Sequence, residues 1–451
     1  MAKNNFRTLW IEIPEGLKKR NFWSLIFIGF LVNAILPLFH IIQPIWLEKV
    51  IKIDPAYYGE INANLQVIME IVNIVFVGYI GILSDRFGRK ILLLIGYVIF
   101  GLGFLTYGSS NVIADFIGID AIIVVYILRG INALTFLFLW PQVITLIADY
   151  TSVENRGRGM GAINFVGIFG AVISLVLLSK VPKIFGINWF FYLGPILGIL
   201  GFIAVTAGIV DRNSKHKSSH HHVAEKKEWK KVLLAAKKSV GLRVGFLSSF
   251  SARADQSLLG LFLITWAVKV ASEFGKSAAA ATAITSAFIG VNVVFAAISS
   301  PLWGFLTDRW SRKSVLCLCL ALSGFGYLGL VFLSSPFTPV LYFLMFLIGS
   351  GVSGITIASQ TMTADLSPKE IVGSVLGAFN TTGAVGIMFF ALAGGYLFDH
   401  SGFTMPFLLK GLGDILVISY ALLNWSKIPH HKEISAQDKQ ETECVAAENP
   451  E

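Results

Sequence analysis

The sequence predicts an all-α membrane protein with twelve transmembrane helices, arranged as two pseudo-symmetric bundles of six. Three observations lead to this fold class. The 451 residues are 55% hydrophobic and only 14% charged, with a mean hydropathy of +0.71. A soluble chain of this length needs more charge on its surface. The apolar residues form long continuous runs, and two polar motifs occur at matching places in each half of the chain.

Each apolar run is long enough to cross a bilayer, for which a helix needs about 20 residues. The runs are continuous and do not alternate with polar residues, which favours helices over a β-barrel. We predict twelve spans, at 22–47, 60–83, 91–110, 120–147, 159–180, 189–210, 242–268, 279–306, 314–334, 339–363, 373–397 and 403–425.

The basic residues predict the orientation of the spans. With the N-terminus inside, 27 of the 36 lysines and arginines lie in inner segments and only six in outer loops. Cytoplasmic segments carry such an excess of positive charge. We therefore expect both termini to be cytoplasmic, in a bacterial inner membrane. The net charge of +9 then reflects contact with the lipid bilayer, and we expect no nucleic-acid partner.

Polar segments divide the chain into five parts. We predict a cytoplasmic N-terminal segment at 1–21, a first bundle at 22–210, a linker at 211–241, a second bundle at 242–425 and a cytoplasmic tail at 426–451. The linker contains "KKEWKKVLLAAKKSV", which predicts a basic amphipathic helix on the inner leaflet. The N-terminal "FRTLWIEIPEGLKKRNFW" suggests a second such helix, with Pro14 as a break.

The second bundle repeats the motifs of the first. "GILSDRFGRK" at Gly81 returns as "GFLTDRWSRK" at Gly304, after the second and eighth spans. "ADYTSVENRGRGMGAIN" at Ala148 returns as "ADLSPKEIVGSVLGAFN" at Ala364, after the fourth and tenth spans. Two coincidences at the same relative positions are improbable, so the chain is a duplicated six-helix unit.

These motifs resemble those of the major facilitator superfamily of secondary transporters, over nearly the whole chain. The first loop signature consists of Gly81, Asp85, Arg86, Gly88, Arg89 and Lys90. The second copy keeps Gly304, Asp308, Arg309, Arg312 and Lys313. It has Ser311 where the first copy has Gly88.

The resemblance implies that this pair of motifs forms a gate between the two bundles. Asp85 would then meet the N-terminus of the eleventh helix, and Asp308 that of the fifth, while the cavity is open to the outside. A carboxylate at a helix N-terminus contributes about 0.3–1 kcal/mol when exposed. The alternative is that the basic residues only anchor the loops to anionic lipid.

Six ionisable residues stand out towards the middle of predicted spans, where each needs a partner or a water-filled cavity. They are Glu70, Arg129, Arg253, Asp255, Lys410 and Asp414. Lys410 and Asp414 are four residues apart on one helix face and are predicted to form a local structural pair. Arg253 and Asp255 point in well-separated directions, so at least one must reach another helix or the cavity.

The residues predicted to contact the solute or carry the coupling ion are Glu70, Arg129, Arg253, Asp255 and Gln256. The resemblance implies that the first, fourth, seventh and tenth helices line the path. Two arginines there favour an anionic or zwitterionic small-molecule substrate. Glu70 and Asp255 are the carboxylates that could carry a proton. For Asn33, His40, Gln43, Asn132, Gln256 and Gln360, helix packing is the favoured role and solute contact the alternative.

The function predicted is therefore proton-coupled transport, a symport, of a small polar and anionic solute by alternating access. One alternative is multidrug efflux, although the fifth span lacks the Gly-Pro step that is usual in such members of the superfamily. Another is a sensor or assembly protein of this fold that transports nothing.

No phosphate-binding loop is found, so we do not expect transport driven by ATP. No nucleophile–base arrangement is found either, and we expect no enzymatic activity. No cofactor and no metal site is predicted. The linker histidines, His216 and His220 to His222, lie among lysines and lack other ligands at suitable spacing. We expect the chain to be a monomer.

Overall fold

The computed structural model describes residues 6–8, 11–13, 16–151, 156–211, 226–368 and 371–429. The N-terminal segment is not the amphipathic helix that we predicted. Two short strands, β1 (Phe6–Thr8) and β2 (Ile11–Ile13), pair antiparallel, with Phe6 opposite Ile13. The Ile-Glu-Ile of β2 alternates apolar and charged residues, and this period of two suits a strand better than a helix.

The first half of the chain contains the helices that carry the first six predicted spans. They are α1 (Lys19–Ile35), α2 (Leu38–Trp46), η1 (Leu47–Ile51), η2 (Pro55–Tyr57), α3 (Tyr58–Phe87), α4 (Arg89–Tyr107), α5 (Ser110–Ile117), α6 (Ala121–Asp149), α7 (Arg156–Val176), η4 (Leu178–Lys180), α8 (Val181–Phe185), α9 (Ile187–Phe191) and α10 (Leu193–Gly208).

The second half begins with the linker helix and carries the last six predicted spans. Its elements are α11 (Lys226–Lys238), α12 (Val240–Ala252), α13 (Asp255–Leu258), η5 (Leu259–Leu263), α14 (Ile264–Lys269), η6 (Ser272–Phe274), α15 (Ala278–Arg309), α16 (Arg312–Val331), α17 (Val340–Asp365), α18 (Val372–His400), α19 (Met405–Leu423) and η8 (Trp425–Lys427).

Eleven helical segments of the described chain are long and apolar enough to cross a membrane. The predicted seventh span, 242–268, is present in a different form. It consists of α12, α13, the π-helical turn η5 and α14, and the helical hydrogen bonding is interrupted at Arg253 and Ala254. The interruption coincides with the most polar part of the span, where side chains compete with regular helix packing.

The linker helix α11 confirms the predicted helix in "KKEWKKVLLAAKKSV". Its Val232 is buried in a small cluster with Leu242 of α12 and with Ile371 and Val375 at the start of α18. One side of α11 therefore packs on the second bundle, while Leu233 and Leu234 are exposed.

The duplication seen in the sequence is also present in the packing. In the first half α1 packs on α7, α3 on α6, and α4 on both α6 and α10. In the second half the equivalent pairs are α12 with α18, α15 with α17, and α16 with both α17 and α19. Each half is thus a bundle built from the same set of helix pairs.

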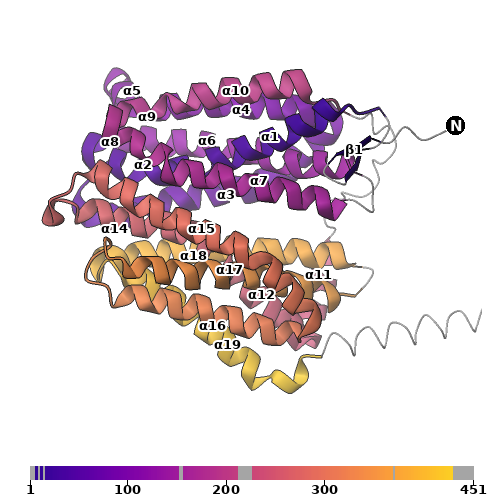
Figure 1. The fold of residues 1–451 in the computed structure, drawn as a ribbon. Coiled ribbons are helices and arrows are strands. Elements are labelled where there is room, and N and C mark those ends of the chain that lie inside the picture. The colour runs from indigo at the N-terminus through magenta and orange to yellow at the C-terminus, as the bar shows by residue number, and fades with distance from the viewer. Residues whose placement is uncertain are drawn as a thin grey trace, which may run out of the picture.

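The two bundles lie side by side and meet through α3 against α18 and α7 against α15 (Figure 1). At the end of the molecule where α3 begins, the helices approach closely. A Cβ on Gly59 would lie 2.7 Å from the carbonyl oxygen of Gly395, and one on Gly395 would lie 2.8 Å from that of Gly59. Small residues permit such close packing of two helices.

At the opposite end α3 is exposed around most of its circumference. Four consecutive residues, Ile74, Val75, Phe76 and Val77, are 40%, 63%, 41% and 52% exposed. Successive side chains of an α-helix are 100° apart, so these four point in directions all around the helix. A helix packed in a bundle would expose only one stripe of its surface to lipid. Gly78 and Gly81 on α3, and Gly373 and Gly377 on α18, have no other group within 4 Å of an added Cβ. The bundles therefore separate towards the α3–α4 loop.

Candidate functional site: polar contacts along the interface of the bundles

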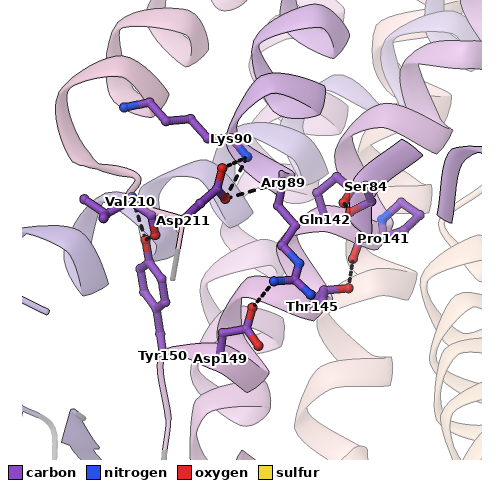
Figure 2. Close-up of polar contacts among 10 residues, drawn as sticks. All are labelled: Ser84, Arg89, Lys90, Pro141, Gln142, Thr145, Asp149, Tyr150, Val210 and Asp211. Carbon is purple, nitrogen blue, oxygen red and sulfur yellow. Dashed lines mark hydrogen bonds and ion pairs between the residues drawn. The ribbon is translucent and has the colours of Figure 1, made fainter. Parts of the chain in front are cut away.

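Arg89 and Lys90 of the predicted loop signature are the first two residues of α4 (Figure 2). The carboxylate of Asp211, just after α10, accepts hydrogen bonds from the backbone N–H groups of Arg89 and Lys90, both at 3.1 Å. An anion at this position satisfies free N–H groups and the positive end of the helix dipole. Asp211 therefore ties the end of the sixth span to the beginning of the third.

Gly88 makes this contact possible. Its backbone has φ +90°, which L side chains rarely adopt, and a Cβ added there would meet the carboxylate of Asp211. Glycine is thus required both for the turn between α3 and α4 and for the close approach of the acid.

Two basic side chains of the signature join α4 to neighbouring helices. Arg89 forms an ion pair of 2.8 Å with Asp149 at the end of α6, and Lys90 donates to the carbonyl oxygen of Thr206 in α10 at 3.2 Å. Nearby, Tyr150 donates to the carbonyl oxygen of Val210 and accepts from its N–H, both at 2.9 Å. Burial raises the pKa of Tyr150 to about 12.

The second motif makes the equivalent ion pair within the second bundle. Arg312 pairs with Asp365 at the end of α17 and donates to the carbonyl oxygen of Thr361 at 3.3 Å. Among the described residues, no acid equivalent to Asp211 accepts a hydrogen bond from the start of α16. Instead Lys313 donates to the carbonyl oxygens of Trp425 and Ile428, at 2.9 and 2.7 Å.

The predicted contacts of Asp85 and Asp308 with the opposite bundle remain a prediction. The structure does not describe the side chain of Asp85, and Asp308 is exposed at the end of α15. Arg86 and Arg309 lie over the rings of Phe87 and Phe305 on their own helices. A Cβ added at Gly81 or at Gly304 would have no other group within 4 Å, because the bundles are apart at this end.

At the opposite end of the interface a carboxylate does join the bundles. Asp399 in α18 accepts hydrogen bonds from the N–H groups of Gly59 and Glu60, both at 2.8 Å, at the first turn of α3. We call this contact the Asp399 cap. Around it, His400 lies 3.6 Å from Glu60, and Lys269 donates to the carbonyl oxygen of Pro55 at 2.9 Å.

Near the middle of the interface two predicted residues approach each other from opposite bundles. Glu70 of α3 is buried, accepts a hydrogen bond of 3.2 Å from Gln66, and lies within electrostatic range of Arg253 and Arg129. Arg253 donates to the side-chain oxygen of Asn380 in α18 at 2.8 Å. Its side chain lies over Gly383, where a Cβ would overlap it.

Arg129 is placed deeper than we expected. Arg129 is only 2% exposed, and its Nε has no hydrogen-bond partner. Its guanidinium carbon lies 4.2 Å from the ring centroid of Phe39. A guanidinium over an aromatic face is a favourable cation–π contact. The charge is thus held between α2 and α6, close to Glu70 and away from the exposed part of the interface.

Asp255 is directed away from Arg253 and into the second bundle. Its Oδ1 lies 3.1 Å from Nζ of Lys410 in α19, and Lys410 also contacts both oxygens of Asp414, at 2.7 and 2.6 Å. The predicted Lys410–Asp414 pair therefore exists but is part of a larger group. We call Asp255, Lys410 and Asp414 the buried triad. Gln256 follows in α13, and its side chain is outside what the structure describes.

Several neutral polar residues serve helix packing. Gln43 donates to Asn62 at 2.9 Å, Asn33 to the carbonyl oxygen of Gly29 at 2.9 Å, and Asn132 to those of Gly103 and Leu128. His40 is enclosed between helices, with its Nε2 lacking a partner, and Gln360 is exposed. No group of three metal-binding side chains occurs in the described residues, and the linker histidines lie outside them.

Sequence reasoning missed three acids that hold the motifs in place. Asp149 and Asp365 occupy the same position in the two copies of the second repeated motif. Their position after the fourth span of each half was the signal that could have identified them. Asp211 was assigned to the linker because it begins the polar stretch. No spacing rule could have connected it to residues 89 and 90, since the contact depends on how α4 and α10 pack.

Asp211→Asn should lower the stability of the first bundle by about 1 kcal/mol, the usual cost of losing a helix cap. Thermal unfolding of the purified protein in detergent measures this change. Asp115→Asn, at an exposed position on α5, is the matched control and should leave the unfolding temperature unchanged. Equal unfolding temperatures for wild type and Asp211→Asn would show that the cap does not stabilise the fold.

The sequence matches the profile of the Major Facilitator Superfamily over residues 22–266 and 245–447. The magnetosome protein MamH of Paramagnetospirillum magneticum is 31% identical over 406 residues, which are 90% of this chain and 93% of that protein. The magnetosome protein MamZ of the same organism is 30% identical over 88% of this chain, and the alignment spans 62% of that longer protein.

A more distant relative is Multidrug resistance protein 2 of Bacillus subtilis, 24% identical over 88% of this chain and 92% of that protein. Among solved structures, the nucleoside transporter NupG aligns with a TM-score of 0.69 at 14% identity, covering 90% of this chain and 99% of that one. The D-xylose–proton symporter aligns with a TM-score of 0.68 at 16% identity, covering 91% and 99%. These structures share the fold.

Proposed function

Since the chain belongs to the Major Facilitator Superfamily, we propose that it is a proton-coupled secondary transporter that moves a small polar, anionic solute by alternating access. The chain is a multi-pass membrane protein of a transporter superfamily and has the fold of known transporters. The nature of the solute and the coupling proton are the two parts that we propose.

One observation carries the proposal of an anionic solute. Arg253 reaches across to Asn380 at the level where the bundles begin to separate, with Glu70 of the other bundle within electrostatic range. Guanidinium groups bind carboxylates and phosphates through two parallel hydrogen bonds. A solute anion that replaced Asn380 as the partner of Arg253 would also compete with Glu70.

The geometry of the interface supports alternating access. The bundles are in contact at the Asp399 cap and apart at the α3–α4 loop. If the termini are cytoplasmic, as we propose from the basic residues, this conformation is closed to the outside and open to the cytoplasm. The opposite conformation would then bring Asp85 to the start of α18 and Asp308 to the start of α7. Accessibility of single cysteines introduced into the α3–α4 loop to a membrane-impermeant reagent tests this orientation.

Arg253→Gln should weaken binding of the transported anion at least tenfold, because a hydrogen bond to a charged group contributes about 1.5–3 kcal/mol. The wild-type protein is first screened by thermal shift against a panel of carboxylate and phosphate metabolites. The dissociation constant of a stabilising compound is then compared between variants.

The matched control for this prediction is Arg243→Gln. Arg243 lies earlier in the same span and donates to Tyr420 at 2.8 Å and to the carbonyl oxygen of Lys237, far from the interface. Its replacement should leave the dissociation constant unchanged. A panel in which only neutral or cationic compounds bind would refute the anionic solute.

Multidrug efflux is the second candidate function, favoured by similarity to Multidrug resistance protein 2 over most of the chain. It is distinguished by deletion of the gene, which would raise susceptibility to lipophilic cations if the protein exports them. A loss of growth on one nutrient would favour uptake of a polar solute instead.

We also propose that the protein acts at the magnetosome, because two magnetosome proteins are 30–31% identical to it over 88–90% of the chain. Fractionation of cells that carry a fluorescent fusion tests this location. Uniform distribution over the inner membrane would contradict the magnetosome location and favour the bacterial inner membrane as a whole. Absence of flux for every solute tested in proteoliposomes would favour the third function, a sensor or assembly protein.

A further inference from the structure

We propose that the buried triad binds one exchangeable proton on the carboxylate of Asp255, at a site inside the second bundle and separate from the central Glu70–Arg253 region. The proposal that a proton binds here depends only on the structure of the triad. The role of this proton in coupling rests on the proposed transport function.

The charge of the triad is unbalanced. Asp255, Lys410 and Asp414 have side-chain exposures of 1%, 0% and 0%, so none of them is solvated. With all three groups ionised the triad carries a net charge of −1 in an apolar interior, where an uncompensated charge is very unfavourable. One proton makes the triad neutral.

The hydrogen bonds show which carboxylate remains ionised. Asp414 accepts from Ser251 at 2.7 Å and from Ser323 at 3.0 Å, and each of its oxygens also accepts from Lys410. Four hydrogen bonds, from three side chains on three helices, stabilise the anionic form of this carboxylate. Lys410 and Asp414 thus form a neutral and well-satisfied pair.

Asp255 has a different environment. Neither of its oxygens accepts a hydrogen bond of good geometry, although Nζ of Lys410 is 3.1 Å away. The hydroxyl of Tyr327 in α16 faces Asp255 and interacts with it, but the two groups are not aligned as a regular hydrogen bond. A protonated Asp255 can donate to this hydroxyl oxygen, which satisfies both groups. Lys410, Asp414 and Tyr327 are the titratable groups that face Asp255 in the described structure, while Arg253 is bound to Asn380.

The position of Asp255 connects this proton to the interface of the bundles. Asp255 is the first residue of α13, directly after the interruption at Arg253 and Ala254. When ionised, Asp255 is attracted to Lys410 and draws α13 towards α19. When it is protonated, Lys410 belongs to Asp414 alone and this attraction is lost. Protonation therefore changes the restraint on the segment that also holds Arg253 against α18.

Infrared spectroscopy of the purified full-length protein tests the proposal without any solute. At neutral pH the wild type should show the carbonyl stretch of a buried protonated carboxyl group, and Asp255→Asn should lack it. Glu70→Gln is the control for the other buried carboxyl group of the interface and should retain the Asp255 band.

Asp414→Asn provides a second variant if Asp255→Asn does not fold. With Asp414 neutral, Lys410 can pair with Asp255 alone, so Asp255 ionises and the same band should disappear. A band of unchanged size in both variants would place the proton elsewhere. Absence of the band from the wild type would show a permanently charged triad. Either result overturns the proposal.

Transport measurements separate this site from the proposed function. In proteoliposomes with an imposed pH gradient, Asp255→Asn should lose gradient-driven accumulation of the identified solute while retaining solute exchange. A wild type that shows the carboxyl band but accumulates no solute with the gradient would contradict proton coupling and leave the proton site intact. Full accumulation by Asp255→Asn would remove this proton from coupling.

Discussion

Lys410→Met should destabilise the folded protein by about 3–5 kcal/mol, the cost of removing one partner from a buried ion pair. Lys410 is fully buried and is the only cation among the described residues that contacts Asp255 and Asp414. Its loss leaves the Asp414 carboxylate, next to the proton-binding Asp255, without a counter-ion in the second bundle. The expected result is a large fall in the unfolding temperature and in the yield of monodisperse protein in detergent.

A triple variant distinguishes loss of charge from loss of packing. Lys410→Met combined with Asp255→Asn and Asp414→Asn leaves no charge in the triad, and neutral groups of similar shape are often tolerated in place of a buried ion pair. We expect much of the lost stability to return. If the triple variant were as unstable as Lys410→Met alone, side-chain packing of Lys410 would account for the effect instead of its charge.

Asp399→Asn should shift the conformational equilibrium away from the state closed at the Asp399 cap. The asparagine retains one acceptor oxygen but loses the charge that favours the N-terminus of α3, which we estimate at about 1.5 kcal/mol, or roughly a tenfold change in populations. Distances between spin labels on cysteines introduced at Tyr57 and Ser401 report on this end. Labels at Phe87 and Gly373 report on the other.

The distance at the cap should lengthen in Asp399→Asn while the distance at the α3–α4 loop shortens. Asp54→Asn is the matched control, because Asp54 accepts a hydrogen bond from Ala56 at 2.9 Å within its own loop and joins no second bundle. Unchanged distributions at both ends in Asp399→Asn would show that the cap does not hold the bundles together.

Much of the fold could be predicted from the sequence because lipid imposes a simple rule. A segment of about 20 apolar residues must be helical to satisfy its backbone in the membrane. The positions of eleven helices follow from this rule, and the repeated motifs indicate the two equivalent bundles. The rule does not apply to β1 and β2, which lie outside the spans, and it fails at Arg253, where a polar cluster interrupts the helix.

The candidate site was less accessible to sequence reasoning. The direction of Asp255 away from Arg253 follows from helical period, and so does the contact between Lys410 and Asp414. That Asp255 approaches Lys410, 155 positions later in the chain, does not follow from any local pattern. It results from the packing of α12 and α13 beside α19 and α16.

The sequence by itself determined that the chain crosses a membrane many times, that its halves are duplicates, and which ionisable side chains lie inside the spans. These properties depend on residue type and local period, which each segment carries alone. The tertiary structure decided the partners: Asp211 with the start of α4, Asp399 with the start of α3, and Asp255 with Lys410. Such contacts join residues distant in the chain, and only the packing of the helices brings them within a few ångströms.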